Sequence, residues 1–272
     1  MADQEAMAAA APDGAATAVT NATTTLASHG RVDRVFPLAS VTKPLAAYAV
    51  LVAVDQGRVK LDDDVDGEGR TVAHLLAHAS GLGPDEAGPH TAPERRRAYS
   101  NHGFEVLGSY VEDAVRRPLA SWLQAQVLLP LGMHDTALEG SPAKDGHGTV
   151  EDLLRFAREL LAPTLVEPEL AERARSPQWP DLAGVLPGYG RQDPNPWGLG
   201  LEVRGSKDPH WTDGSFPPST VGHFGQSGSY LWVSPDDGCA AAYLGPEPFG
   251  QWAVDAWPLL TRVQLELARE AG

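Results

Sequence analysis

The sequence predicts an α/β (α+β) fold, in which an antiparallel sheet is flanked by helices and a helical domain is inserted between the two halves of the sheet domain. Two observations predict it. Helical periodicity dominates the middle of the chain, and short apolar runs bounded by Gly, Pro and Asp dominate residues 197–244. The expected organisation is a loose tail over residues 1–14, a sheet domain formed by residues 15–60 and 195–272, and a helical domain over residues 61–194.

The first elements are a strand region and a central helix. Residues 15–36 carry small and β-branched side chains, which predict a short strand or hairpin. Residues 40–56 predict a helix, and every residue from Leu45 to Val54 is apolar or is Tyr48. A helix that is apolar on all its faces is buried, so we expect this one at the centre of the core.

Four further helices are expected in the middle of the chain. The first begins at Thr71 and ends near Gly81. Apolar residues at helical spacing predict the next two, over residues 102–117 and residues 119–129. The capping-box pattern that opens at Thr149 predicts the fourth.

The last part of the chain changes from loop to strands. Residues 162–196 hold seven prolines and little periodicity, so they are expected to be mostly loop. The arginine run at residues 95–97 is likewise expected in a solvated loop. Strands are expected over residues 197–203, 220–224, 229–233 and 239–244, and a closing helix over residues 249–270.

The composition is that of a globular protein with an acidic surface. The chain has 272 residues, 42% of them hydrophobic, and a formal net charge of −15. So acidic a surface repels phosphate groups, which disfavours nucleic acid and anionic membranes as partners. The single Cys239 excludes an intrachain disulfide. The acidic start and the lack of any apolar run of ~18 residues predict no export signal and no membrane span, and most simply a cytoplasmic protein.

The segment 40–44 is the strongest candidate for chemistry. Proline is tolerated only in the first turn of a helix, so Pro44 requires the helix to begin near Ser40. Free N–H groups there favour a developing negative charge, and Lys43 lies on the same helix face. A serine hydroxyl needs a base to become a nucleophile, and a lysine with a lowered pKa can be that base. The alternative is a helix cap followed by an exposed lysine.

Two further segments carry polar groups. Tyr99 and Asn101 lie just before a predicted helix, where a phenol can relay a proton and an amide can orient a lysine or a substrate. The alternative use of Asn101 is as a helix cap. His223 and Gly225 lie on a predicted strand, and the glycine would let a substrate approach the backbone closely. The alternative is a histidine of the sheet beside a turn.

Taken together and in this order, the Ser-x-x-Lys, Tyr-x-Asn and His-x-Gly segments resemble the serine β-lactamase and penicillin-binding-protein family. The similarity is to its class C-like branch of esterases and D-amino-acid peptidases. It extends to residues 74–82, 130–133 and 197–200 and covers about residues 18–268. The resemblance implies a β-lactamase/transpeptidase-like fold.

The resemblance also implies roles for individual residues. Ser40 would be the acyl-accepting nucleophile, Lys43 its general base, and Tyr99 would share in proton transfer. Asn101 would position the substrate, and His223 and Gly225 would line the strand side. The backbone N–H groups of Ser40 and Gln226 would form the oxyanion hole. The implied chemistry is the formation and hydrolysis of an acyl-enzyme, with no metal and no cofactor.

One departure from the family bears on the substrate. Its β-lactamases usually carry a lysine and a hydroxyl residue where this chain has His223 and Phe224. Neither a phenyl ring nor a neutral imidazole supplies the charge that binds a carboxylate. We therefore expect a neutral small-molecule ester or amide as the substrate, and inefficient β-lactam hydrolysis. The alternative functions are a non-catalytic binding protein that retains the fold and an acyltransferase with the same residues.

Overall fold

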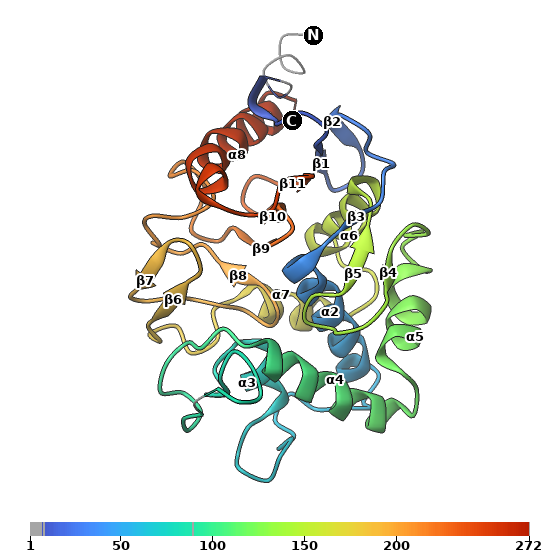
Figure 1. Ribbon diagram of the computed structural model, residues 1–272. Coiled ribbons are helices and arrows are strands. Elements are labelled where there is room, and N and C mark those ends of the chain that lie inside the picture. Colours follow the sequence, from blue (N-terminus) through green and yellow to red (C-terminus); the bar gives the residue numbers. More distant parts are fainter. Residues whose placement is uncertain (1–6, 8, 89, 272) are drawn as a thin grey trace.

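A six-stranded antiparallel sheet forms the frame of the protein. The computed structural model describes residue 7 and residues 9–88 and 90–271. The strand order is β2-β1-β11-β10-β9-β8, so strands from both ends of the chain lie side by side (Figure 1). The strands are β1 (Ala16–Asn21), β2 (Thr25–His29), β8 (Glu202–Val203), β9 (Val221–Gly225), β10 (Ser229–Ser234) and β11 (Cys239–Leu244).

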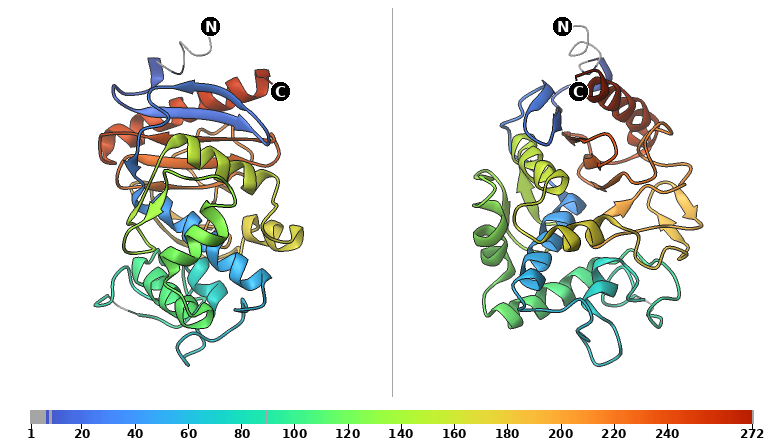
Figure 2. Two further views of the ribbon diagram at one scale, coloured as in Figure 1. Left: turned by 90° about the vertical axis from the view of Figure 1, so that its right-hand side faces the viewer. Right: turned by 180° about the vertical axis from the view of Figure 1, so that it is seen from behind.

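Helices cover both faces of this sheet. The C-terminal helix α8 (Gln251–Ala271) packs on one face, and α6 (Val150–Leu161) packs on the other (Figure 2). Side chains alternate along the strands to match: Tyr230 and Trp232 join the core beneath α8, whereas Leu231 and Val233 join the core on the opposite face. Strands β1, β9, β10 and β11 are therefore buried on both faces, which explains their largely apolar sequences, whereas the edge strand β2 is partly exposed.

The central helix is α2 (Thr42–Asp55), and a short 3-10 turn precedes it at Ala39–Val41. Every residue from Thr42 to Ala53 is buried, as the sequence predicted. Helices α4 (Asn101–Val115) and α5 (Leu119–Leu123) pack against α2, and α5 continues as a π-helical turn over Gln124–Leu128. The short helix α3 (Val72–Leu76) packs against α4. A small sheet of β3 (Phe36–Pro37), β5 (Gly146–Gly148) and β4 (Ala137–Leu138) lies beside the start of α2.

Several expected elements differ in extent. The loop expected over residues 162–196 contains helix α7 (Pro168–Arg175) and a hairpin of β6 (Gly184–Leu186) and β7 (Gly190–Gln192). Pro168 does not oppose α7, because a proline at the first helical position loses no hydrogen bond. Of the strand expected over residues 197–203 only β8 forms, since Gly200 turns the chain with a φ of 84°.

The sheet domain and the helical domain, expected to divide at residues 61 and 194, share one core in the structure. Helix α6 falls in the range expected for the helical domain, yet it packs against β1, β10 and β11. A single core runs from these strands through α6 and α2 to α4 and α5. Half of the tail expected over residues 1–14, namely residues 1–6 and 8, lies outside the described residues, and Met7 is fully buried against the core beneath α8.

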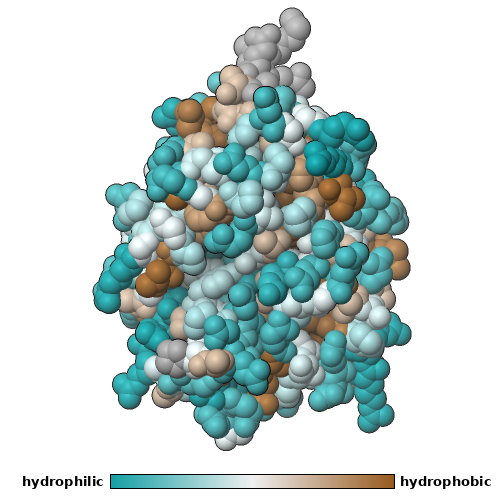
Figure 3. All heavy atoms as spheres, in the orientation of Figure 1, coloured by the Kyte–Doolittle hydropathy of each residue, from teal (hydrophilic) through white to brown (hydrophobic). Residues whose placement is uncertain are grey.

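The surface is mixed in character. On the face shown in Figure 3, apolar side chains are scattered among polar ones and do not gather in one patch. Among the helices of the described residues, none has both the length and the hydropathy that a bilayer crossing requires. The large apolar side chains that are most exposed are Val35, Leu129, Val185 and Leu259.

Candidate active site

Ser40 lies in the 3-10 turn that leads directly into α2. Pro44 is accommodated in the first turn of the helix, as the sequence required. Just before the serine, the Leu38 amide donates to the Gly146 carbonyl (2.8 Å), and Ala39 adopts a left-handed φ of 45°. A left-handed alanine is strained and persists only where its surroundings hold it. The backbone at Ser40 is therefore firmly fixed.

Lys43 is fully buried, so the alternative of an exposed lysine is wrong. Its Nζ lies 3.5 Å from Ser40 Oγ and donates to Asn101 Oδ1 (2.7 Å) and to the Ala143 carbonyl (2.8 Å). Burial lowers the pKa of Lys43 to about 7, and the charge of Glu105 opposes this only in part. A neutral amine can give its two hydrogens to these acceptors, which leaves its lone pair for the serine hydroxyl. The arrangement suits a base at Ser40.

Tyr99, in the loop before α4, and Asn101, the first residue of α4, reach the serine and the lysine. The cap of α4 is Ser100, whose Oγ accepts a backbone amide of the first turn (2.8 Å). Asn101 is therefore not the cap, and its amide oxygen accepts from Lys43. The Tyr99 ring centre lies 4.6 Å from Lys43 Nζ. Burial raises the pKa of Tyr99 well above its ordinary value, and a hydrogen bond with Ser40 acts in the opposite direction.

Strand β9 closes the other side of Ser40. Gly225 permits this approach, because a Cβ there would lie 2.5 Å from the Leu38 carbonyl oxygen and 3.0 Å from Ser40 N. His223 shares the face of Gly225, since side chains alternate along a strand. The Phe224 side chain points into the core beneath α8, and the residue still lines the cavity described next.

A cavity of about 50 Å³ lies between Ser40 and β9. Five of the eight residues singled out from the sequence line it, namely Ser40, Tyr99, His223, Phe224 and Gln226. Lys43 and Asn101 join the site through the hydrogen bonds given above, and Gly225 joins it through its backbone contact with Ser40. The sequence did not point to Leu186, Pro187 or Glu202 as lining residues.

His223 is held in its neutral form. Its Nδ1 donates to the Phe224 carbonyl oxygen (2.7 Å), which leaves Nε2 without a proton. Burial lowers the pKa of His223 to about 3, and the nearby charge of Lys43 contributes to this shift. The imidazole therefore brings no positive charge to the cavity at neutral pH.

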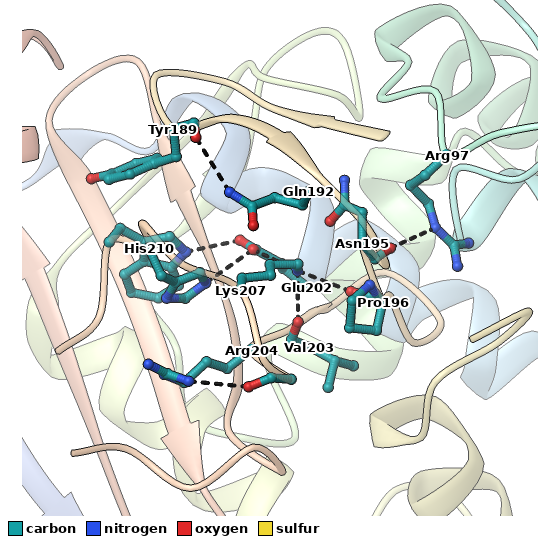
Figure 4. A network of polar contacts seen from close by, with 12 residues as sticks. Arg97, Tyr189, Gln192, Asn195, Pro196, Glu202, Val203, Arg204, Lys207 and His210 are labelled. Carbon is teal, nitrogen blue, oxygen red and sulfur yellow. Dashed lines mark hydrogen bonds and ion pairs between the residues drawn. The ribbon is translucent and has the colours of Figure 1, made fainter. Parts of the chain in front are cut away.

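Glu202 on β8 is a fully buried carboxylate that lines the same cavity. It accepts from Lys207 Nζ (2.8 Å), His210 Nε2 (3.0 Å) and Trp211 Nε1 (2.8 Å), and Figure 4 shows the centre of this network. Burial by itself raises the pKa of Glu202, but Lys207 and His210 outweigh it and hold the pKa well below its ordinary range. One feature of the sequence could have marked Glu202 as a candidate: it is the single charged residue in the otherwise apolar run of residues 197–203.

Arg97 corrects the expectation of a fully solvated arginine run, because its side chain is buried. Its guanidinium donates to the carbonyl oxygens of Asn195 (3.0 Å), Ala77 (2.6 Å), Gln178 (2.6 Å) and Trp179 (2.8 Å). Burial lowers the pKa of Arg97 to about 10. Figure 4 shows its bond to Asn195. The arginine therefore ties the loop of Tyr99 to three other segments around the site.

This chain is similar to known proteins, in some comparisons over nearly its whole length and in others over part of it. The beta-lactamase family model matches residues 3–246. The crystal structure of a beta-lactamase (Mb2281c) from Mycobacterium bovis has 44% sequence identity and a TM-score of 0.95, and the similarity covers 98% of this chain and 99% of that chain. Esterase EstB from Burkholderia gladioli is 34% identical over 151 residues, and penicillin-binding protein 4* from Bacillus subtilis is 27% identical over 140 residues. Each of these two matches spans 39% of this chain, and they span 38% and 31% of the relatives' own lengths.

These similarities agree with the architecture. The family model matches most of the chain, and the Mycobacterium bovis structure is similar over nearly its whole length. The antiparallel sheet with helices on both faces is thus the β-lactamase/transpeptidase-like fold expected from the sequence. On these grounds the chain belongs to the beta-lactamase family.

Proposed function

We propose that this protein is a serine hydrolase that cleaves a small ester or amide through a covalent acyl-enzyme on Ser40. The observation that carries the proposal is the pair of Ser40 and Lys43: a fully buried amine with a pKa of about 7 lies 3.5 Å from the serine Oγ. Membership of the beta-lactamase family and the esterase among its relatives support a hydrolytic enzyme.

Acylation begins when the substrate carbonyl carbon lies against Ser40 Oγ. Lys43 Nζ takes the hydroxyl proton as Oγ forms the bond to carbon. The carbonyl oxygen gains negative charge and is stabilised by the backbone N–H groups of Ser40 and Gln226, where one such donor typically contributes about 3 kcal/mol. Gly225 supports this role, because the absence of a Cβ brings β9 close to Ser40 N. Tyr99 passes the proton to the leaving group as its bond to the carbonyl carbon breaks.

Deacylation reverses these roles with water as the nucleophile. Water gives a proton to the Tyr99–Lys43 pair as its oxygen attacks the acyl carbon, and Ser40 Oγ takes a proton back as it leaves. Asn101 keeps Lys43 in position through its hydrogen bond to Nζ. An acyltransferase differs only in that an alcohol or amine replaces the water, so the acceptor alone separates the two activities.

The substrate is uncharged at the group that faces β9. His223 is neutral, and Phe224 offers no hydrogen-bond donor in the place where family β-lactamases bind a carboxylate. The carboxylate of Glu202 lines the same cavity and disfavours a second anion there. A cavity of about 50 Å³ also favours a small acyl or leaving group.

Covalent labelling tests the proposal directly. The protein is incubated with p-nitrophenyl acetate or a fluorophosphonate, and the adduct is mapped by mass spectrometry. We expect one adduct on Ser40, none in Ser40→Ala, and the wild-type adduct in the control Ser109→Ala, which changes an exposed serine of α4. Absence of any adduct between pH 7 and about 9 would instead indicate a non-catalytic binding protein. Release of methyl ester in the presence of methanol measures the share of acyl transfer.

A further inference from the structure

Three aromatic side chains around Tyr99 have buried ring nitrogens without a hydrogen-bond partner among the described residues. They are His78 Nε2, Trp197 Nε1 and His223 Nε2. The Trp197 ring centre lies 4.7 Å from that of His78 and 5.4 Å from that of His223, and it is nearly perpendicular to both. All three side chains are at most 3% exposed. A buried polar group left without a partner costs about 1–3 kcal/mol, so this cluster requires an explanation.

The hydrogen-bonding role of each nitrogen follows from its neighbours. His223 Nδ1 donates to a carbonyl oxygen, so His223 Nε2 is an acceptor. His78 Nδ1 accepts from the Ser100 amide (3.2 Å), so His78 Nε2 carries the hydrogen and is a donor. Burial lowers the pKa of both histidines, which keeps these tautomers at neutral pH. The indole N–H of Trp197 can only donate. The cluster thus offers two donors and one acceptor.

A hydroxyl oxygen complements this set, because it has one hydrogen to donate and two lone pairs that accept. An ammonium group cannot accept, and a carboxylate cannot donate. We propose that Trp197 Nε1 and His223 Nε2, which belong to residues lining the cavity, form a subsite for a single hydroxyl oxygen, which a substrate or a water molecule supplies. Trp197 and His223 line the cavity that contains Ser40, so the inference rests on the proposed function and specifies its substrate. The cavity of about 50 Å³ has room for such a group, since a water needs about 10–15 Å³.

Matched esters test the substrate as the source of the hydroxyl. The p-nitrophenyl esters of butyric, 2-hydroxybutyric, 3-hydroxybutyric and 3-methoxybutyric acid differ in a single group. We expect kcat/KM of one hydroxy ester to exceed that of the butyrate by about tenfold, because two buried partners are satisfied at once. The methoxy ester should show no such gain, since an ether oxygen cannot donate to His223.

Two tryptophan variants locate the effect. Trp197→Phe keeps an aromatic ring and removes the N–H, so the advantage of the hydroxy ester should fall to about twofold or less. Trp252→Phe, on α8 outside the cavity, is the control and should keep the full advantage. A hydroxyl preference that survives unchanged in Trp197→Phe would place the hydroxyl elsewhere and overturn the proposal.

A crystal structure of the free protein tests water as the source. If the esters react alike, the proposal requires an ordered oxygen within about 3.2 Å of both His223 Nε2 and Trp197 Nε1. Equal rates for all esters together with no ordered oxygen there would overturn it. Failure of the proposed function gives a different result. No ester would then acylate Ser40, whereas an ordered oxygen at Trp197 Nε1 and His223 Nε2 would still support the subsite.

Discussion

Replacement of Lys43 by methionine removes the proposed base and keeps a side chain of similar length in the same buried position. Burial holds the pKa of Lys43 at about 7, so near neutral pH about half of the molecules carry the free amine. General-base assistance typically accelerates a step 10²–10⁴-fold. We therefore expect the acylation of Ser40 by p-nitrophenyl acetate to fall about 100-fold or more in Lys43→Met.

The pH dependence supplies a second test of the same group. The neutral amine is the active form, so the wild-type acylation rate should rise about tenfold per pH unit below 7 and level off above about pH 8. This inflection should be absent in Lys43→Met. The assay is the burst of p-nitrophenolate in stopped-flow measurements from pH 5.5 to pH 9. Lys60→Met, which changes an exposed lysine, is the control and should retain the wild-type rate and profile.

Two results would refute this reasoning. One is acylation of folded Lys43→Met within about threefold of the wild-type rate, which would assign the proton to another group. The other is a wild-type rate that does not change between pH 6 and pH 8, which would mean that no base with a pKa of about 7 acts in this step. Far-UV circular dichroism and thermal unfolding establish that the variant is folded.

Three further predictions test the surroundings of this pair. Folding lowers the pKa of Lys43 from 10.5 to about 7, so the unfolded chain binds more protons between these values. The difference in unfolding free energy between the wild type and Lys43→Met should therefore shift in favour of the wild type from pH 7 to pH 10.5, by up to about 5 kcal/mol. Urea titrations at several pH values measure this difference. A difference that does not change with pH would contradict the burial of the amine. Gly225→Ala should slow acylation at least about tenfold and lower Tm, because the alanine methyl group would lie 2.5 Å from the Leu38 carbonyl oxygen. Unchanged kinetics would mean that β9 has room to move. Glu202→Gln should destabilise the protein by about 3–5 kcal/mol in thermal unfolding, because it leaves Lys207 charged, buried and without its anionic partner. A loss below about 1 kcal/mol would show that the Glu202–Lys207 ion pair is not needed for stability.

Elements with a strong local pattern could be predicted from the sequence. The run from Leu45 to Val54 has no polar face, and α2 is buried as expected. The failures come where local composition is ambiguous. A count of prolines predicted a loop over residues 162–196, but Pro168 stands in the first turn of α7, where it loses no hydrogen bond. The apolar run over residues 197–203 predicted one strand. The chain turns at Gly200, so only the two residues of β8 form a strand there.

The meeting of the three site segments could not be derived from their own patterns. Helical spacing alone places Lys43 beside Ser40, because the two are three residues apart. The hydrogen bond from Lys43 to Asn101 joins positions 58 residues apart, and the contact of Gly225 with Ser40 depends on the register of β9. Only the resemblance to a family connected these segments in advance, since no local rule fixes such distant contacts.

Arg97 shows why a buried charge can leave no trace in a sequence. Adjacent arginines repel one another and are usually solvated, so the run predicted an exposed loop. A guanidinium can instead be satisfied by backbone carbonyl oxygens, which every residue has, and no acidic partner then marks the pairing. Its bonds to Ala77 and Asn195 span 20 and 98 residues, and they hold the loop of Tyr99 against the segment that carries Trp197. The position of the phenol beside Ser40 therefore depends on a residue that does not line the cavity itself.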